Sequence, residues 1–246
     1  MRDVVIVFAG TKFTEGHVEQ KRRQLDKYCS IPTRLTVLTD DPARINAIGL
    51  RDTRSCLLPD TWQLEGHRKL WWYKCFMFSK SLSWLGGDVL YMDLDTVIIN
   101  NVEHLWNYNP GKFCILQDFN RAFIAEYPVS NSSVMRFNPK IHTDIHEYFD
   151  QDWQQLIRKF RGDQDYLTWW LKDRESYWWP KQWCMSYKWE IKHGGSRHGG
   201  TDLRWPIDYY EPDIAHIIPE DCSIAVFHGE PDPFDTVFGN NLHYLG

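Results

Sequence analysis

The stretch "DVLYMDLDTVIINN", residues 88–101, constrains the fold more than any other part of the sequence. Eight of the eleven residues from Val89 to Ile99 are apolar, which predicts a buried β-strand, but two of the others are the acids Asp93 and Asp95. Side chains alternate along a strand, so both carboxylates are expected to point the same way. Two like charges near a core repel each other and need a partner. A hard divalent cation, Mg²⁺ or Mn²⁺, suits carboxylate oxygens.

The Asp-x-Asp spacing carries little information without its context. It occurs three times, at 93/95, 150/152 and 163/165. Only the first triplet follows an apolar run inside a predicted strand. The carboxyl end of a parallel strand faces the crevice where α/β proteins bind ligands. We therefore interpret the triplet at 93/95 as a metal site, with a capped strand end as the alternative.

Strand and helix patterns alternate along the chain, which predicts an α/β fold with a largely parallel sheet. Further strands are predicted over 4–9, 34–42, 112–118, 130–138 and 222–229. Helices are predicted over 14–28, over 67–85, from Asn138-Pro139 onward and over 163–172. The glycine-rich segment 193–200 is predicted to be a mobile loop.

The predicted helix over 67–85 has an apolar stripe formed by Trp71, Cys75, Phe78, Leu82 and Leu85. Gly86 and Gly87 are expected to end it. Lys74 lies about 60° from this stripe, given 100° per residue, and so at the edge of the core. From there it can reach a phosphate or hydroxyl of a ligand, or extend along a solvated face.

Composition excludes several classes of protein. The 246 residues suit one large domain, and the net charge of −5 argues against a nucleic-acid partner. The six cysteines form no Cys-x-x-Cys pair and are expected to be reduced and mostly buried. The apolar run at 4–9 is too short for a signal peptide, and no stretch is long enough to span a membrane. We expect a cytoplasmic protein.

Four stretches together resemble GT-A glycosyltransferases related to glycogenin and the retaining bacterial galactosyltransferases (family 8-like). They are "VLYMDLDTVI", "NSSVMRFNP", "GDQDYL" and "FHGEPDP". Their order and spacing match that family over roughly residues 1–230, and soluble bacterial or phage members are the most similar. The resemblance implies a Rossmann-like, mostly parallel sheet in a single domain. It implies transfer of a sugar from a nucleotide-sugar, with UDP-hexose as the expected donor and retention of configuration.

The resemblance also implies a ligand set for Mn²⁺ or Mg²⁺. Asp93 and Asp95 would hold the metal on the donor diphosphate, with His228 as the third ligand. The metal would stabilise the charge of the leaving group. The family's lysine after this histidine is missing from "HGEPDP", so another basic residue must meet the phosphate charge. The candidates are Lys188, Lys192 and Arg197.

Further site residues follow from the same resemblance. The triplet Asp163, Gln164 and Asp165 matches a stretch beside the anomeric carbon, where a carboxylate or amide could stabilise an oxocarbenium-like transition state. Asp163 shares a helical face with Leu167 and Trp170 and should point inward, although an acid at this position is also a common helix cap. The other residues are expected to bind the donor; they are Phe8, Ala9, Gly10 and Thr11 for base and ribose, Asp40 for the base, Lys74, and Asn131 for the sugar.

The chain is expected to divide into a nucleotide-binding half, 1–118, and an acceptor- and sugar-binding half, 119–246. The acceptor is open: a carbohydrate, a protein or a small molecule. The many tryptophans beyond residue 150 could line its cleft, or fill the core instead. Two other functions stay open, a sugar nucleotidyltransferase and a non-catalytic carbohydrate-binding protein. A Rossmann dehydrogenase is disfavoured because the first strand is not followed by Gly-x-Gly-x-x-Gly.

Overall fold

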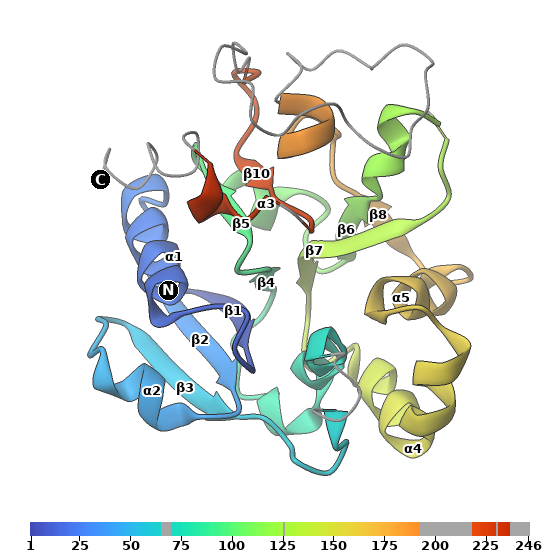
Figure 1. The fold of residues 1–246 in the computed structure, drawn as a ribbon. Coiled ribbons are helices and arrows are strands. Elements are labelled where there is room, and N and C mark those ends of the chain that lie inside the picture. Colours follow the sequence, from blue (N-terminus) through green and yellow to red (C-terminus); the bar gives the residue numbers. More distant parts are fainter. Residues whose placement is uncertain (65–69, 125, 192–217, 230, 237–246) are drawn as a thin grey trace.

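The computed structural model of the chain describes residues 1–64, 70–124, 126–191, 218–229 and 231–236. Within these ranges the protein is an α/β domain built on one large sheet and one small sheet (Figure 1). The predicted loop over 193–200, with Arg197, and the predicted phosphate ligand Lys192 lie outside the described residues.

The large sheet has seven strands, all parallel except one. β7 runs antiparallel to both of its neighbours, β4 and β6. The predicted mostly parallel sheet is therefore confirmed. In spatial order the strands are β3 (Thr53–Leu57), β2 (Thr33–Thr39), β1 (Arg2–Phe8), β4 (Val89–Met92), β7 (Ser130–Phe137), β6 (Phe113–Gln117) and β8 (Ser176–Trp178).

The direction of β7 brings distant segments together. The carboxyl ends of β1, β2, β4 and β6 lie at one edge of the sheet, and β7 begins at that same edge because it runs the opposite way. The ends of four strands and the start of a fifth thus meet where α/β proteins bind ligands.

The single strand predicted over 88–101 is wrong. β4 ends at Met92, Asp93 to Asp95 form a turn, and β5 (Thr96–Ile98) belongs to the small sheet. The Thr96 N–H donates to the Asp93 carbonyl over 3.2 Å, which closes the turn. An apolar run without a Gly or Pro gives no local sign of such a break. The small sheet has the order β5, β10 (Ile224–Val226) and β9 (Cys184–Ser186).

Two apolar layers cover the faces of the large sheet. Val4 and Ile6 of β1 pack with α1 (Glu15–Tyr28), α3 (His104–Asn107) and the small sheet, whereas Val5 packs with α4 (Thr143–Lys159) and α5 (Asp163–Leu171). Figure 1 shows α4 and α5 together, away from α1 and α2 (Pro42–Ala47). Alternation along the strands thus produces a buried sheet with both faces covered.

The segment predicted as one helix over 67–85 is instead two 3₁₀ segments, η2 (Leu70–Phe78) and η3 (Lys80–Leu82). Its apolar stripe is buried except for Trp71, which is 44% exposed. The helix predicted from Pro139 begins four residues later, at Thr143, because Asn138 caps a turn by accepting from the Lys140 N–H. Tertiary packing overrides the local signal in the first case, and a local side-chain hydrogen bond delays the helix in the second.

Three further elements are short and irregular. They are the 3₁₀ segments η4 (Phe119–Ala122) and η6 (Pro233–Asp235) and the π-helical turn η5 (Tyr187–Ile191). All six cysteines are free thiols and five are buried, which confirms the interpretation of the sequence. Among the described residues, no helix is both long and apolar enough to cross a bilayer.

The side chain of Arg136 on β7 is fully buried and holds the loop after α3 against the sheet. Its guanidinium donates to the carbonyl oxygens of Leu105 (2.8 Å), Trp106 (3.1 Å), Lys112 (3.1 Å) and Asn109. Arg136→Met would leave these carbonyls buried without donors, each at a cost of about 1 kcal/mol or more. We expect the free energy of unfolding to fall by about 3 kcal/mol or more, measured in urea.

Arg158→Met is the matched control, because Arg158 is exposed on α4. Its loss should change the free energy of unfolding by no more than about 0.5 kcal/mol. Equal effects of the two substitutions would contradict the role assigned to Arg136.

Candidate functional site

A pocket of about 230 Å³ opens at the carboxyl edge of the large sheet, between the ends of β1 and β4. Its lining combines apolar side chains with two lysines and two acids. The polar members are Lys12, Lys74, Asp93 and Asp95. The two carboxylates of the Asp-x-Asp triplet therefore face one cavity, although a turn rather than a strand places them there.

A lysine ammonium lies at the centre of the site. Lys74 Nζ is 2.9 Å from each carboxylate oxygen of Asp93 and 3.6 Å from Asp163 Oδ2. It also donates to Ser132 Oγ over 3.1 Å. Burial lowers the pKa of Lys74, but the charges of Asp163 and Asp93 outweigh it and raise the pKa above its ordinary value. The lysine predicted at the edge of the core is thus buried and charged.

Asp163 reaches the same cluster from the first turn of α5. It is 4% exposed, and its Oδ2 accepts from Ser132 Oγ over 2.6 Å. Gly162, not Asp163, occupies the N-cap position, so the capping interpretation is wrong and the predicted inward orientation is confirmed. Burial raises the pKa of Asp163, while Lys74 lowers it.

The neighbouring amides form a chain of hydrogen bonds. Asn131 Nδ2 donates to Gln164 Oε1 over 3.0 Å, and Gln164 Nε2 donates to Asp118 Oδ2 over 2.8 Å. Asp118 follows the end of β6, and the sequence interpretation missed it. Its position directly after a predicted strand was the available signal. These bonds determine how the side-chain amides of Asn131 and Gln164 are oriented, that is, where each places its oxygen and its nitrogen.

Asp95 carries the least compensated charge of the site. Its nearest cation is the exposed Lys12, with Nζ 3.4 Å from Asp95 Oδ2. Burial, together with the charge of Asp93, raises the pKa of Asp95 to about 6. By contrast, Asp93 has both Lys74 and the Tyr91 hydroxyl, which donates to its Oδ1 over 2.5 Å. Tyr91 is a second residue that sequence reasoning missed.

The turn after β1 lies beside this pocket. Gly10 has a positive φ of 70°, and its N–H donates to the Asp40 carboxylate over 2.8 Å. This bond ties the ends of β1 and β2 together, which fits the expectation that both strand ends contribute to one site. Ala9 lines the pocket, Phe8 is buried beneath the Arg44 guanidinium, and Thr11 is exposed.

His228 follows β10, where the Phe227 N–H donates to the Asp95 carbonyl over 2.9 Å. The imidazole Nε2 lies 2.7 Å from Ser186 Oγ, and the ring stacks on Phe119. Burial, aided by the charge of Lys188, lowers the pKa of His228 to about 3. The ring is therefore neutral at physiological pH, the state in which histidine binds metals.

Lys188 lies against the backbone that follows His228. A Cβ placed on Gly229 would be 3.3 Å from Lys188 Nζ, and Gly229 has a positive φ of 78°. A basic side chain thus reaches the segment where the family's lysine is missing. Lys188 of η5 therefore brings a positive charge to the segment after His228.

The side chains predicted to bind a metal match the preferences of a hard cation only in part. Within the described ranges, no group of three or more His, Cys, Asp or Glu side chains is arranged as a metal centre. Asp93 and Asp95 nevertheless present two carboxylates to one pocket, and a divalent cation would relieve their mutual repulsion. The two oxygen donors therefore fit Mg²⁺ or Mn²⁺, and His228 lies after β10, one residue beyond the Phe227 N–H that donates to the Asp95 carbonyl.

A buried lysine holds the turn that carries both acids. Lys21 on α1 is 1% exposed, and its Nζ donates to the Thr96 carbonyl (2.5 Å) and to Thr96 Oγ1 (2.6 Å). Burial lowers the pKa of Lys21 to about 7, against the raising effect of Asp95 and Asp93. The polar helix pattern over 14–28 gave no sign that this lysine turns inward.

Asp165 does not join this cluster. It is one residue from Gln164, but it lines a separate pocket on the far side of α5. The structure therefore brings Asp163 and Gln164 together with Lys74, Asp93 and Asn131, and places Asp165 elsewhere.

The fold, with its carboxylates at the strand ends, is the GT-A fold of nucleotide-sugar-dependent glycosyltransferases. The galactosyltransferase LgtC, solved in complex with donor and acceptor sugar analogues, is 14% identical with a TM-score of 0.65, over 99% of this chain and 94% of its own. An active-site mutant of LgtC superposes with a TM-score of 0.68 at the same identity and coverage.

Longer glycosyltransferases share the fold. GlyE of Streptococcus pneumoniae is 12% identical with a TM-score of 0.64, and the match covers 99% of this chain and 60% of GlyE. The bifunctional glycosyltransferase WbbM is 12% identical with a TM-score of 0.61, over 98% of this chain and 48% of WbbM. No model of a protein family matches the sequence, and no curated protein does. At such identities the likeness establishes the fold.

Because the charge of Asp95 is only weakly compensated, we predict that removing this charge stabilises the protein. Because burial and the charge of Asp93 raise the folded-state pKa of Asp95 to about 6, above the ordinary 3.8 of an aspartate, ionisation destabilises the fold as pH rises from about 4 through 6. Asp95→Asn should therefore raise the free energy of unfolding of the metal-free protein by about 2 kcal/mol at pH 7.5 and change it little at pH 4. Urea unfolding in EDTA measures both values. Asp152→Asn, an exposed acid of another Asp-x-Asp triplet, is the control. A loss of stability at pH 7.5 in Asp95→Asn would contradict the assignment.

Removal of Lys74 should have the opposite effect. Its raised pKa means that its stabilising charge is fully present at neutral pH. Lys74→Met leaves Asp93 and Asp163 buried without a cation, so we expect a loss of about 3–5 kcal/mol at pH 7.5. The loss should be smaller at pH 5, where Asp163, whose pKa is raised by burial, takes up a proton more readily.

The control for Lys74→Met is Lys80→Met, since the Lys80 side chain is 75% exposed. It should change the free energy of unfolding by no more than about 0.5 kcal/mol. An equal loss at pH 7.5 and pH 5 in Lys74→Met would show that packing, not charge, explains the effect.

Proposed function

We propose that the protein is a metal-dependent glycosyltransferase, which moves a hexose from a UDP-sugar to an acceptor with retention of anomeric configuration. One observation carries the proposal. The carboxylates of the buried Asp95 and the partly buried Asp93 face a cavity at the carboxyl edge of the sheet, beside the ends of β1 and β2. In this fold a nucleotide binds at that edge.

The turn Phe8–Thr11 is our proposed site for the base and ribose. Two observations support this: Ala9 of the turn lines the pocket, and the positive φ of Gly10 with its bond to Asp40 fixes the turn against the end of β2. Asp40 is the proposed contact for the base.

The metal site is proposed to consist of Asp93, Asp95 and His228, with Mn²⁺ or Mg²⁺ as cofactor. When bound, the cation supplies charge stabilisation for a nucleoside diphosphate leaving group. Lys188 is proposed to take the place of the missing phosphate-binding lysine, because its ammonium lies beside Gly229. The neutral state of His228 supports its role as a ligand.

Asp163 and Gln164 are the proposed groups beside the anomeric carbon. Lys74 lies 3.6 Å from Asp163 Oδ2 and Ser132 donates to the same oxygen, so the carboxylate is oriented to stabilise an oxocarbenium-like transition state. Asn131 orients the Gln164 amide and is the proposed contact for the donor sugar. Lys74 then positions both acids and has its charge committed to them.

The remaining expectations stay predictions. They include a nucleotide-binding half, 1–118, and an acceptor- and sugar-binding half, 119–246. They also include the cytoplasmic location, the absence of a nucleic-acid partner and the unknown acceptor. A nucleotidyltransferase is less well supported, because the turn after β1 has two glycines and one lysine over 8–16 where a triphosphate needs more donors. A purely carbohydrate-binding role leaves the buried acid pair unexplained.

Calorimetry of UDP binding tests the proposal. We expect UDP to bind with Mn²⁺ and to lose at least about tenfold in affinity when EDTA replaces the metal, because the diphosphate then meets two carboxylates. Asp95→Ala should abolish binding. Asp152→Ala, the second acid of the exposed triplet 150/152, should leave it unchanged.

Product analysis separates the candidate functions. With UDP-hexose and Mn²⁺, a glycosyltransferase releases UDP, whereas a nucleotidyltransferase makes pyrophosphate from UTP and a sugar phosphate. If no nucleotide binds with or without metal, the acid pair is a structural strand end and the proposal is wrong.

A further inference from the structure

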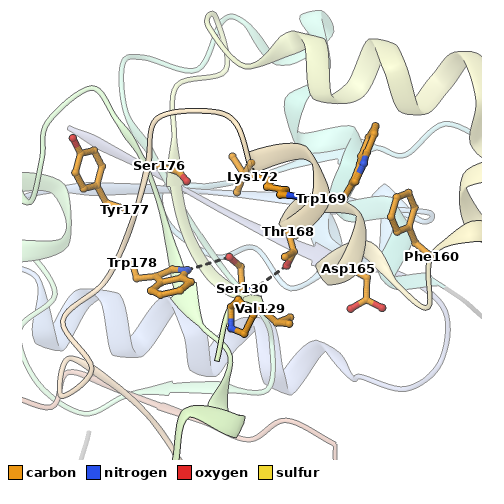
Figure 2. Close-up of a pocket in the computed structure, with 12 residues that line it drawn as sticks. Val129, Ser130, Phe160, Asp165, Thr168, Trp169, Lys172, Ser176, Tyr177 and Trp178 are labelled. Carbon is orange, nitrogen blue, oxygen red and sulfur yellow. Dashed lines mark hydrogen bonds between the residues drawn. The ribbon is translucent and has the colours of Figure 1, made fainter. Parts of the chain in front are cut away.

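A second and larger pocket of about 760 Å³ lies apart from the acid pair, between α5 and β8 (Figure 2). α5 supplies Asp165, Thr168 and Trp169 to it, β7 supplies Ser130, and β8 supplies Trp178. The volume is within the range of small-molecule sites. None of the roles assigned so far to the donor, the metal or the reacting carbon uses this cavity.

Two tryptophans form its walls. Trp178 is 38% exposed and Trp169 is 40% exposed, which leaves part of each ring open to solvent. Figure 2 shows them on either side of Ser130 and Thr168. Both indoles are held in place: Trp178 Nε1 donates to Ser130 Oγ over 3.1 Å, and Trp169 packs against Phe160 with ring centroids 5.5 Å apart. Two anchored, half-exposed rings form a preorganised apolar surface.

The floor and rim of the pocket are polar. Ser130 accepts from Trp178 and keeps its own O–H to donate, and Ser176 adds a second hydroxyl. Asp165 and Lys172 provide one carboxylate and one ammonium, and within the described part of the chain neither forms an ion pair. Their charges cancel, so the pocket favours a ligand without net charge over an anion or a cation.

We propose that this pocket binds sugar units of a neutral oligosaccharide. The C–H face of a pyranose packs on an indole ring, while its hydroxyls need both donors and acceptors around the edge. The half-exposed faces of Trp169 and Trp178 meet the first requirement. Ser130, Ser176 and Asp165 meet the second, with a carboxylate as the strong acceptor.

The pocket is connected to the candidate active site by shared elements. Ser130 lines the pocket, and the next two residues of β7 bond to Gln164 and Asp163. The Ser130 N–H donates to Thr168 Oγ1 over 3.0 Å, so the start of β7 and α5, which carry Ser132 and Asp163 of the polar cluster, also line this pocket. A glycan held here contacts the same two elements that position Asp163. That this glycan is the acceptor chain rests on the proposed function, whereas the binding itself does not.

Titration of the metal-free and nucleotide-free protein with lactose, maltotetraose and cellotetraose tests the proposal. The readout is the shift of the tryptophan indole N–H signals in ¹H–¹⁵N spectra. We expect at least one oligosaccharide to shift the Trp178 and Trp169 signals with saturation. Trp178→Ala should weaken its binding by about tenfold or more.

A second variant keeps the test decisive in the event that Trp178→Ala does not fold. Asp165→Asn keeps the shape of the side chain and removes the charged acceptor, so about tenfold weaker binding is expected with an unchanged melting temperature. Trp84→Ala is the matched control, because Trp84 is 44% exposed and does not line the pocket. Its sugar affinity should equal that of the wild type.

The outcomes separate this inference from the proposed function. Asp95→Ala should bind the oligosaccharide as the wild type does, even where UDP binding is lost. If none of the three sugars binds, or if Trp84→Ala weakens binding as much as Trp178→Ala, the pocket is not a carbohydrate site. Sugar binding without any UDP binding would support the pocket and contradict the glycosyltransferase.

Discussion

The contact of the Lys74 ammonium with Asp93 and Asp163 is the interaction on which the site depends. It joins three elements that are distant in sequence: η2, the turn after β4 and the first turn of α5. A buried lysine is stable in its charged form only with such partners, and its charge in turn opposes the rise that burial causes in the pKa of Asp163. The same contact leaves Asp95 as the acid with the weakest compensation. Asp95 is therefore the carboxylate of this cluster that a bound metal cation would stabilise most.

The antiparallel strand β7 explains why so many polar residues meet at one edge. It begins where β1, β2, β4 and β6 end, so Asn131 and Ser132 face Asp93 and Asp118. The backbone hydrogen bonds between these strands fix this arrangement independently of the side chains. Ser130 extends the same edge into the second pocket, so β7 contributes both to the polar cluster around Lys74 and to that pocket. The start of one strand thus links the chemistry proposed for the acids with the surface proposed for a glycan.

Much of the fold could be predicted from local patterns. The strands at 4–9, 112–118 and 130–138 and the α/β class came from apolar runs between polar segments, and the inward direction of Asp163 came from helical spacing. The break after Met92 and the 3₁₀ form of η2 could not be predicted, because each is decided by packing against distant residues. The late start of α4 was missed for another reason, the local hydrogen bond that the Lys140 N–H donates to Asn138. The sequence also did not predict which tryptophans are exposed. Trp169 and Trp178 line a pocket, whereas Trp170 and Trp179 are buried.

The sequence by itself determined the class of fold and the identity of the acid pair, because hydrophobic periodicity and the placement of Asp93 and Asp95 beside an apolar run are local properties. The tertiary structure decided which partners those acids have. Lys74, Tyr91, Ser132 and Asp118 reach the site from four separate elements, and no spacing along the chain encodes their meeting. Burial and charge at short range depend on three-dimensional neighbours, so the pKa values that define the chemistry of the site are properties of the folded protein.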